Sequence, residues 1–97
     1  MKRKNMVLEK LSGRGDELHR FHVASLSLFG SVARGEDGPG SDIDILVEFV
    51  EPVGMFTFVR LKNYLEDLLD TRIDLVTPEA LKERLRDRIL KEAIRAA

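Results

Sequence analysis

The sequence contains no cysteine and no tryptophan, and only one of its 97 residues is a tyrosine. Without cysteine the chain forms no disulfide, holds no metal through thiolates and uses no cysteine nucleophile. No apolar run approaches the roughly 20 residues that a membrane-spanning helix needs. The basic residues 1–4 are followed by a charged helical pattern instead of a signal-peptide core. We therefore expect a cytoplasmic protein that makes no use of a membrane.

An excess of positive charge is also missing, since 16 basic and 17 acidic residues give a net charge of −1. The composition thus carries no strong signal for nucleic-acid binding. Hydrophobic residues make up 43% of the chain and charged residues 34%, which is typical of a globular domain and not of a disordered one. At this length we expect a single domain over residues 1–97.

Three segments have the spacing of strands, with Val, Ile and Leu between polar residues and turn residues at their ends. They are residues 23–29, 42–50 and 72–76. A glycine- and proline-containing loop over residues 36–40 separates the first two.

Helical spacing surrounds these strands and predicts the order helix, strand, strand, helix, strand, helix. The glycine-broken opening predicts a helix over residues 5–11 and a second turn capped by Asp16. Residues 55–69 form the next expected helix. The last begins near Pro78 and runs to about residue 94, with Leu81, Leu85 and Ile89 in the core. The expected class is α/β (α+β), a small mixed sheet of about three strands covered by helices.

Asp42 and Asp44 lie two residues apart at the start of the second expected strand. Because side chains alternate along a strand, both carboxylates project from one face, about 7 Å apart along the strand. Such a pair is repulsive without a cation, and Mg²⁺ binds carboxylates together with substrate phosphates. Two Mg²⁺ ions would suit an in-line phosphoryl displacement. For Asp-x-Asp alone, the common alternative is a solvated edge of the sheet.

Gly30 and Ser31 end the first expected strand and begin a helical turn over residues 31–34. Free N–H groups at a helix start favour phosphate oxygens, and glycine lets a phosphate approach closely. The alternative is an ordinary turn in which Ser31 caps the helix. A phosphate site and a carboxylate site separated by one short loop together suit a nucleoside triphosphate with its metal.

The two segments Gly-Ser-Val-Ala-Arg-Gly at residues 30–35 and Ser-Asp-Ile-Asp-Ile at residues 41–45 resemble the signature of the DNA polymerase beta-type nucleotidyltransferase superfamily. They are especially similar to its minimal nucleotidyltransferases (MNT), the MntA-like antitoxins of HEPN/MNT toxin–antitoxin pairs. The likeness runs from residue 23 through residues 85–90, and the glycine-broken opening departs from the family's long first helix. The resemblance implies the polymerase-beta-like nucleotidyltransferase fold.

The resemblance also implies the residue roles. Asp74, on the third expected strand, matches the family's third carboxylate, and Asp70 at a helix end is its rival. Asp42, Asp44 and Asp74 are implied to hold two Mg²⁺ ions, with Asp74 helping to deprotonate the attacking hydroxyl. Gly30, Ser31 and Arg34 are expected to bind the nucleotide, although Arg34 could equally brace the acidic cluster or be a plain surface residue.

The implied reaction is transfer of a nucleoside monophosphate, AMP from ATP, to a tyrosine hydroxyl of a cognate HEPN toxin. The protein would then be a metal-dependent protein adenylyltransferase that acts as an antitoxin. Transfer to a small molecule or RNA is one alternative, although such enzymes usually carry a further domain. A non-catalytic module that binds the toxin is another.

Several other polar residues are expected outside the site. His19 and His22 lack metal-binding spacing, and Tyr64 is expected to be partly in the core. Arg84, Arg86 and Arg88 are expected on a solvated helix face, with contact to a partner or a nucleotide as the minor alternative.

Overall fold

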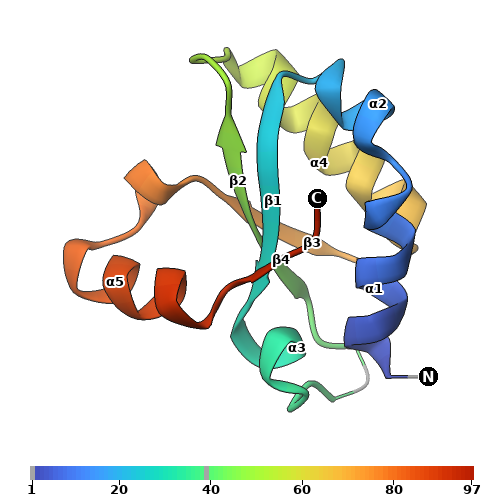
Figure 1. Ribbon diagram of the computed structural model, residues 1–97, viewed down its shortest axis with the longest axis vertical. Coiled ribbons are helices and arrows are strands. Elements are labelled where there is room, and N and C mark those ends of the chain that lie inside the picture. Colours follow the sequence, from blue (N-terminus) through green and yellow to red (C-terminus); the bar gives the residue numbers. More distant parts are fainter. Residues whose placement is uncertain (1, 39) are drawn as a thin grey trace.

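The computed structural model describes residues 2–38 and 40–97, and its chain alternates between helices and strands (Figure 1). The elements are α1 (Arg3–Ser12), α2 (Gly15–His19), β1 (Val23–Phe29), α3 (Gly30–Arg34), β2 (Ile43–Phe49), α4 (Met55–Leu69), β3 (Ile73–Val76), the 3₁₀ helix η1 (Pro78–Ala80), α5 (Glu83–Glu92) and β4 (Ile94–Arg95).

The strands form one mixed sheet in the order β3-β2-β1-β4. β1 pairs antiparallel with both β2 and β4, whereas β2 and β3 are parallel. The predicted mixed sheet is therefore confirmed, with a fourth, two-residue strand that the sequence analysis did not anticipate.

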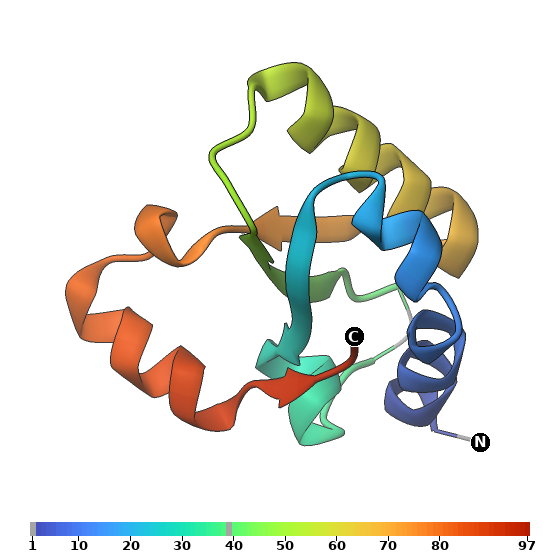
Figure 2. The same ribbon diagram turned by 45° about the horizontal axis from the view of Figure 1, so that its top comes forward.

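The main core lies between the sheet and α1, α2 and α4, which cover one face (Figures 1 and 2). Alternation along the strands turns Leu26 and Leu28 of β1 and Ile43 and Ile45 of β2 to this face, where all four are fully buried. From the helices, the buried core residues are Val7, Leu11, Leu18, Val32, Ala33, Leu61, Leu65 and Leu69. The i, i+4 spacing of the α4 residues explains why that helix lies flat on the sheet.

The glycine-broken opening forms two helices, as expected, but Asp16 does not cap the second one. Arg14 is the N-cap residue of α2, and no side chain makes a capping hydrogen bond. The Arg14 carbonyl instead accepts a hydrogen bond from the Leu18 N–H at 2.9 Å. Asp16 consequently lies in the first turn of α2, where its charge suits the helix dipole.

The expected last helix is shorter than predicted. Leu81 and Lys82 are extended, so α5 begins only at Glu83, and Ala93 is extended at its other end. The chain then turns back, and β4 pairs with β1 instead of continuing the helix. Leu85 is 47% exposed and no residue of α5 is buried, so the predicted core role of Leu85 is wrong. The amphipathic pattern is real, but α5 lies against α3 and stands away from the sheet (Figure 2).

The C-terminal segment is held by backbone hydrogen bonds to β1. The Ala96 N–H donates to the Leu26 carbonyl at 2.8 Å, and the Leu26 N–H donates to the Ala97 carbonyl at 3.1 Å. These bonds fix the end of the chain that follows α5.

We predict that Ala96→Pro lowers the stability by about 0.5–1.5 kcal/mol, because proline removes the shorter of the two hydrogen bonds to the Leu26 carbonyl and leaves only that from the Ala97 N–H, at 3.2 Å. For a domain of this size, each kcal/mol corresponds to a fall in Tm of roughly 4–8 °C. Thermal melting followed by circular dichroism measures the effect, and Ala96→Ser, which keeps the N–H, serves as the control. Equal melting of the two variants would contradict the pairing.

Candidate active site

Asp44 and Asp74 lie side by side in neighbouring parallel strands, because the register of β2 and β3 pairs them directly. Their chain neighbours Ile43, Ile45 and Ile73 are buried under the helices, so alternation turns both carboxylates to the opposite face of the sheet. Asp44 is half-buried there and Asp74 is exposed. The structure thus brings together two of the three predicted carboxylates on the face that α1, α2 and α4 leave open.

Gly30 makes room for the first of these carboxylates. It follows Phe29, the cross-strand partner of Asp44, and its φ of +71° favours glycine. A Cβ at this position would overlap Oδ2 of Asp44 and lie 3.1 Å from its Cγ. The glycine that the sequence analysis linked to phosphate binding is therefore also required by the carboxylate itself.

The turn after Gly30 becomes the short helix α3, whose Val32 and Ala33 are buried in the main core. Its N-cap residue is Phe29 and no side-chain hydrogen bond caps it, so the alternative of Ser31 as an N-cap is wrong. Gly35 ends the helix with a left-handed φ of 72°. Packing of α3 into the core fixes the start of the helix, with its free N–H groups, beside Asp44.

Asp42 lies just before β2, not within it, and is exposed. The strand begins at Ile43, whose N–H donates to the Arg72 carbonyl at 3.1 Å. The predicted start of this strand is therefore one residue too early. Asp42 is nevertheless close enough for its negative charge to raise the pKa of Asp44.

The pKa of Asp44 is raised to about 6. Burial is the largest cause, followed by the charge of Asp74, a hydrogen bond with Asp74 and the charge of Asp42, while the Arg34 charge acts weakly in the opposite direction. At neutral pH the cluster thus carries repulsive negative charge that nearby side chains do not offset. A bound cation would stabilise such a group of carboxylates.

Arg34, which was expected to bind a nucleotide, is engaged by two glutamates. Its Nε lies 3.0 Å from Oε2 of Glu36, and its Nη1 lies 3.1 Å from Oε1 of Glu92 on α5. The sequence analysis missed both partners. Glu36 is two residues away and could have been noticed, whereas the contact with Glu92 depends on the path of α5.

The donor chemistry fits Mg²⁺ bound together with a nucleotide. Within residues 2–38 and 40–97, no three His, Cys, Asp or Glu side chains converge closely enough to hold a metal ion by themselves. Mg²⁺ is usually bound through one or two carboxylates, with substrate phosphates and water completing its shell. The adjacent oxygens of Asp44 and Asp74, with Asp42 nearby, are a donor set of that kind.

Other residues considered in the sequence lie elsewhere. Asp70 is the left-handed C-cap of α4, with φ 52°, and is exposed. His22 pairs with Glu51 across 3.3 Å at the far end of β1. Tyr64 is half-buried, as expected, and donates a hydrogen bond to Glu17.

A family model for the nucleotidyltransferase domain matches residues 8–96. The chain belongs to this family. The protein adenylyltransferase MntA of Thermococcus cleftensis is 43% identical over 75 residues, which cover 77% of this chain and 76% of that protein. The resemblance inferred from residues 30–35 and 41–45 is thereby confirmed.

Two solved structures have a similar fold. A proposed minimal nucleotidyltransferase superposes with a TM-score of 0.81 at 37% identity, covering 97% of this chain and 95% of that one. A chain from the complex of a tri-AMPylated HEPN toxin with an MNT antitoxin, from Shewanella oneidensis, superposes with a TM-score of 0.59 at 18% identity, covering 90% of this chain and 71% of that one. Within the described residues, no helix has the length and hydrophobicity needed to cross a membrane.

Gly30→Ala is predicted to inactivate the site while the fold survives. A left-handed non-glycine residue costs about 1–2 kcal/mol, and the new methyl group must push the Asp44 carboxylate away from Asp74. Thermal melting measures the cost of the left-handed alanine to stability, and a nucleotide-transfer assay on the same sample measures the effect of the displaced Asp44 carboxylate on activity. Gly13→Ala, where a Cβ meets no atom within 4 Å, is the matched control. Normal transfer by Gly30→Ala would show that the position of Asp44 is not critical.

The raised pKa of Asp44 predicts how stability depends on pH in metal-free buffer. Because the pKa of about 6 in the folded state exceeds the ordinary aspartate pKa of 3.8, the folded state binds the proton more tightly than the unfolded state. The contribution of Asp44 to the free energy of unfolding should therefore be fully present below about pH 4 and be lost as the pH rises through about 6. After allowance for solvent screening, we expect a loss of about 1–2 kcal/mol.

Urea unfolding in EDTA between pH 4.5 and pH 8 measures this loss, at about half-unit steps. Asp44→Asn should remove most of the decline, so that the variant is more stable than the wild type at pH 8. An identical pH profile for the two proteins would contradict the repulsion inferred at Asp44.

Proposed function

We propose that this protein is a metal-dependent protein adenylyltransferase. It transfers AMP from ATP to a tyrosine hydroxyl of a partner HEPN toxin and thereby acts as its antitoxin, in the cytoplasm, where ATP is available. Residues 1–97 serve as one catalytic domain. The observation that carries the proposal is the in-register pair Asp44 and Asp74 beside the Gly30 turn.

The comparisons support the choice of reaction. The Thermococcus relative, 43% identical, is named a protein adenylyltransferase. In the Shewanella complex, which shares the fold, a HEPN toxin carries AMP groups and is bound to an MNT antitoxin. Both point to a protein hydroxyl as the acceptor, in preference to a small molecule or RNA.

The nucleotide would be bound from two sides. The N–H groups at the start of α3 and the Ser31 hydroxyl would hold phosphate oxygens, since glycine at position 30 leaves the turn accessible. Asp42, Asp44 and Asp74 would hold two Mg²⁺ ions, which when bound offset the negative charge of carboxylates and phosphates. Arg34 would add a third contact by exchanging Glu36 or Glu92 for a phosphate.

The chemical step is an in-line displacement. The tyrosine oxygen attacks the α-phosphorus, the bond to the bridging oxygen breaks and pyrophosphate leaves. A carboxylate oxygen of Asp74 takes the tyrosine proton, because Asp74 is the more exposed of the paired carboxylates and faces an incoming acceptor. Most of the rate enhancement then comes from orientation and charge neutralisation.

We predict that the partner toxin, incubated with the chain, ATP and Mg²⁺, gains the mass of one or more AMP units. Asp42→Asn, Asp44→Asn and Asp74→Asn should each reduce this transfer about 100-fold or more, since each removes charge at the reacting phosphate. Intact-mass measurement of the toxin follows the reaction. For Asp74→Asn we expect a larger loss in transfer than in nucleotide binding.

Asp70→Asn is the matched control, because it makes the same chemical change at a left-handed C-cap that asparagine tolerates. It should transfer AMP at the wild-type rate. An inactive Asp70→Asn with a normal Asp74→Asn would reverse the assignment of the third carboxylate. Efficient modification of a sugar or antibiotic, with no gain of mass on the toxin, would refute the proposed acceptor.

A further inference from the structure

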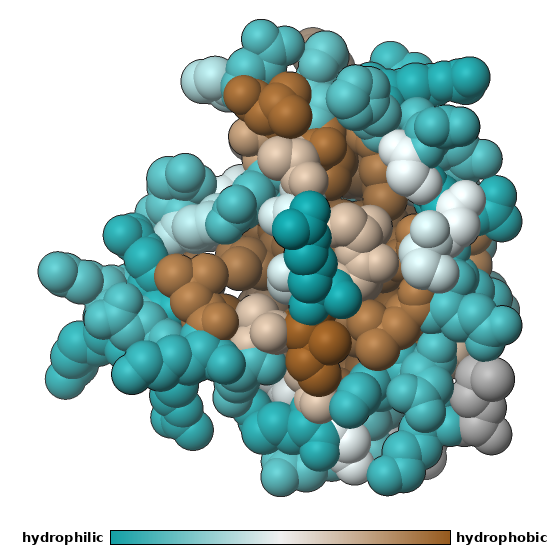
Figure 3. Space-filling view, in the orientation of Figure 1, coloured by the Kyte–Doolittle hydropathy of each residue, from teal (hydrophilic) through white to brown (hydrophobic). Residues whose placement is uncertain are grey.

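Two surfaces of this small molecule expose large hydrophobic side chains. Among the described residues, those exposed on the first surface are Val50, Met55, Phe56 and Val59, around the start of α4. On the second surface they are Leu85 and Leu90 of α5, which are 47% and 43% exposed. Figure 3 shows hydrophobic surface beside α5 and over the neighbouring sheet. Apolar surface gathered in this way is typical of interaction sites.

The first surface contains a groove of about 940 Å³ between the end of β2, the start of α4 and η1. It is lined by residues 47–55, Phe58 and residues 77–79. We call it the acidic groove, because its charged lining residues are Glu48, Glu51 and Glu79 and its described lining includes no lysine or arginine. An apolar floor with an acidic rim suits a basic, amphipathic helix.

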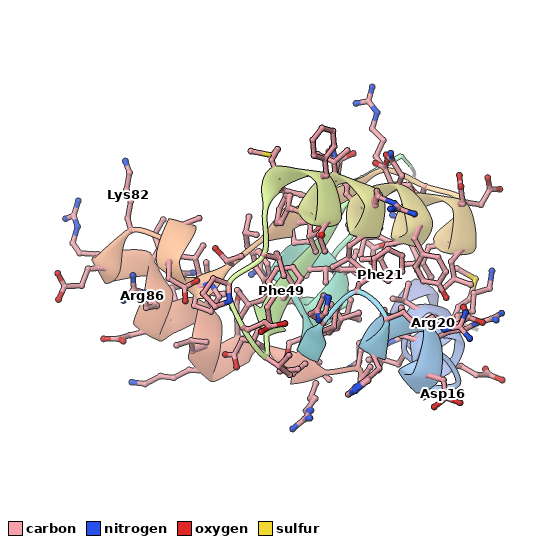
Figure 4. All side chains as sticks on the ribbon, turned by 90° about the horizontal axis from the view of Figure 1, so that it is seen from above. Asp16, Arg20, Phe21, Phe49, Lys82 and Arg86 are labelled. Carbon is pink, nitrogen blue, oxygen red and sulfur yellow. The ribbon has the colours of Figure 1, made fainter. Side chains whose placement is uncertain are left out.

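The second surface is such a helix. Residues 82–92 contain five basic and three acidic side chains. Arg84 and Arg88 are exposed and four residues apart, so they share one side of α5, next to Leu85. Figure 4 shows Arg86 of α5, and Lys82 just before the helix, to one side of Phe49, which lines the groove. The chain thus carries a groove and a helix of complementary charge, and Arg86 contacts the groove of its own molecule only at its edge, through the Pro78 carbonyl.

A molecule cannot place its own α5 in its own groove, because the helix is fixed at both ends. Arg86 donates hydrogen bonds to the carbonyls of Pro78 at 3.0 Å and Leu81 at 3.4 Å, which holds the turn before the helix. At the other end, Glu92 pairs with Arg34 at 3.1 Å, and β4 is hydrogen-bonded to β1. The helix that fits the groove must therefore come from another molecule.

We propose that two copies of this chain form a symmetric dimer in which α5 of each copy lies in the acidic groove of the other. Each of the two contacts joins an α5 to an acidic groove, so a two-fold axis relates them and closes the assembly. Neither α5 nor the groove is then left exposed. A single ten-residue helix covers less than the roughly 1,000 Å² per interface that stable association needs, and the duplicated contact overcomes this shortfall. The dimer is independent of the proposed transfer reaction.

The test uses two charge-reversed variants of the full chain, one with Arg84→Glu and Arg88→Glu, and one with Glu48→Lys and Glu79→Lys. Sedimentation velocity over a concentration series should give the wild type a mass twice 11.0 kDa. Each variant alone then presents like charges at both contacts, so its dimer Kd should rise by about tenfold or more. An equimolar mixture should regain wild-type dimerisation, because both helix–groove contacts of the mixed pair are complementary.

The control is Lys2→Glu, just before α1, combined with Lys10→Glu on α1. It makes the same charge change as the helix variant and should dimerise normally. Circular dichroism confirms that every variant is folded. A wild type that stays monomeric at its highest soluble concentration would overturn the proposal, as would variants that dimerise normally or a mixture that stays monomeric. A monomeric chain whose groove variant loses only toxin binding would assign the groove to the toxin instead.

Discussion

The repulsion between Asp44 and Asp74 is the constraint on which the rest of the site depends. Two carboxylates in register on parallel strands disfavour the folded state at neutral pH, which the raised pKa of Asp44 makes visible. The fold tolerates the pair because the main core, which stabilises the strands, contains neither Asp44 nor Asp74. Gly30 leaves space for one carboxylate, and solvent surrounds the other.

The topology of the sheet follows from bringing these groups to one place. A parallel pair needs a long crossover, which α4 supplies between β2 and β3, so Asp74 arrives at the same end of the sheet as Asp44. The antiparallel partner β1 ends where β2 begins, so Gly30 and α3 arrive there as well. The end of β1, the start of β2 and the start of β3 thus meet, because β2 is antiparallel to β1 and parallel to β3.

The sequence predicted most where local pattern and tertiary packing agree. The expected bounds of β1 and α4 match the structure, because strand alternation and i, i+4 spacing both turn apolar residues to one core. The prediction failed at Leu85, because an amphipathic pattern shows that a helix has an apolar side and not what covers it. The contact between Arg34 and Glu92 could not be predicted from the sequence either, because it depends on where the end of α5 lies in the folded structure.

One face of the sheet supplies most of the folding stability, and the other carries the carboxylates of the candidate active site. On the covered face, fully buried residues such as Leu26, Ile43 and Leu61 supply most of the burial that offsets the entropy of folding. The other face carries Asp44 and Asp74, beside Phe29 and Leu46, which are buried but not part of the main core. Substitutions of the exposed carboxylates can therefore change charge at little cost in burial, whereas substitutions of the main-core residues would leave cavities or unpaired charge. A domain this small can carry a repulsive carboxylate pair because that pair and the core share strands but not a face.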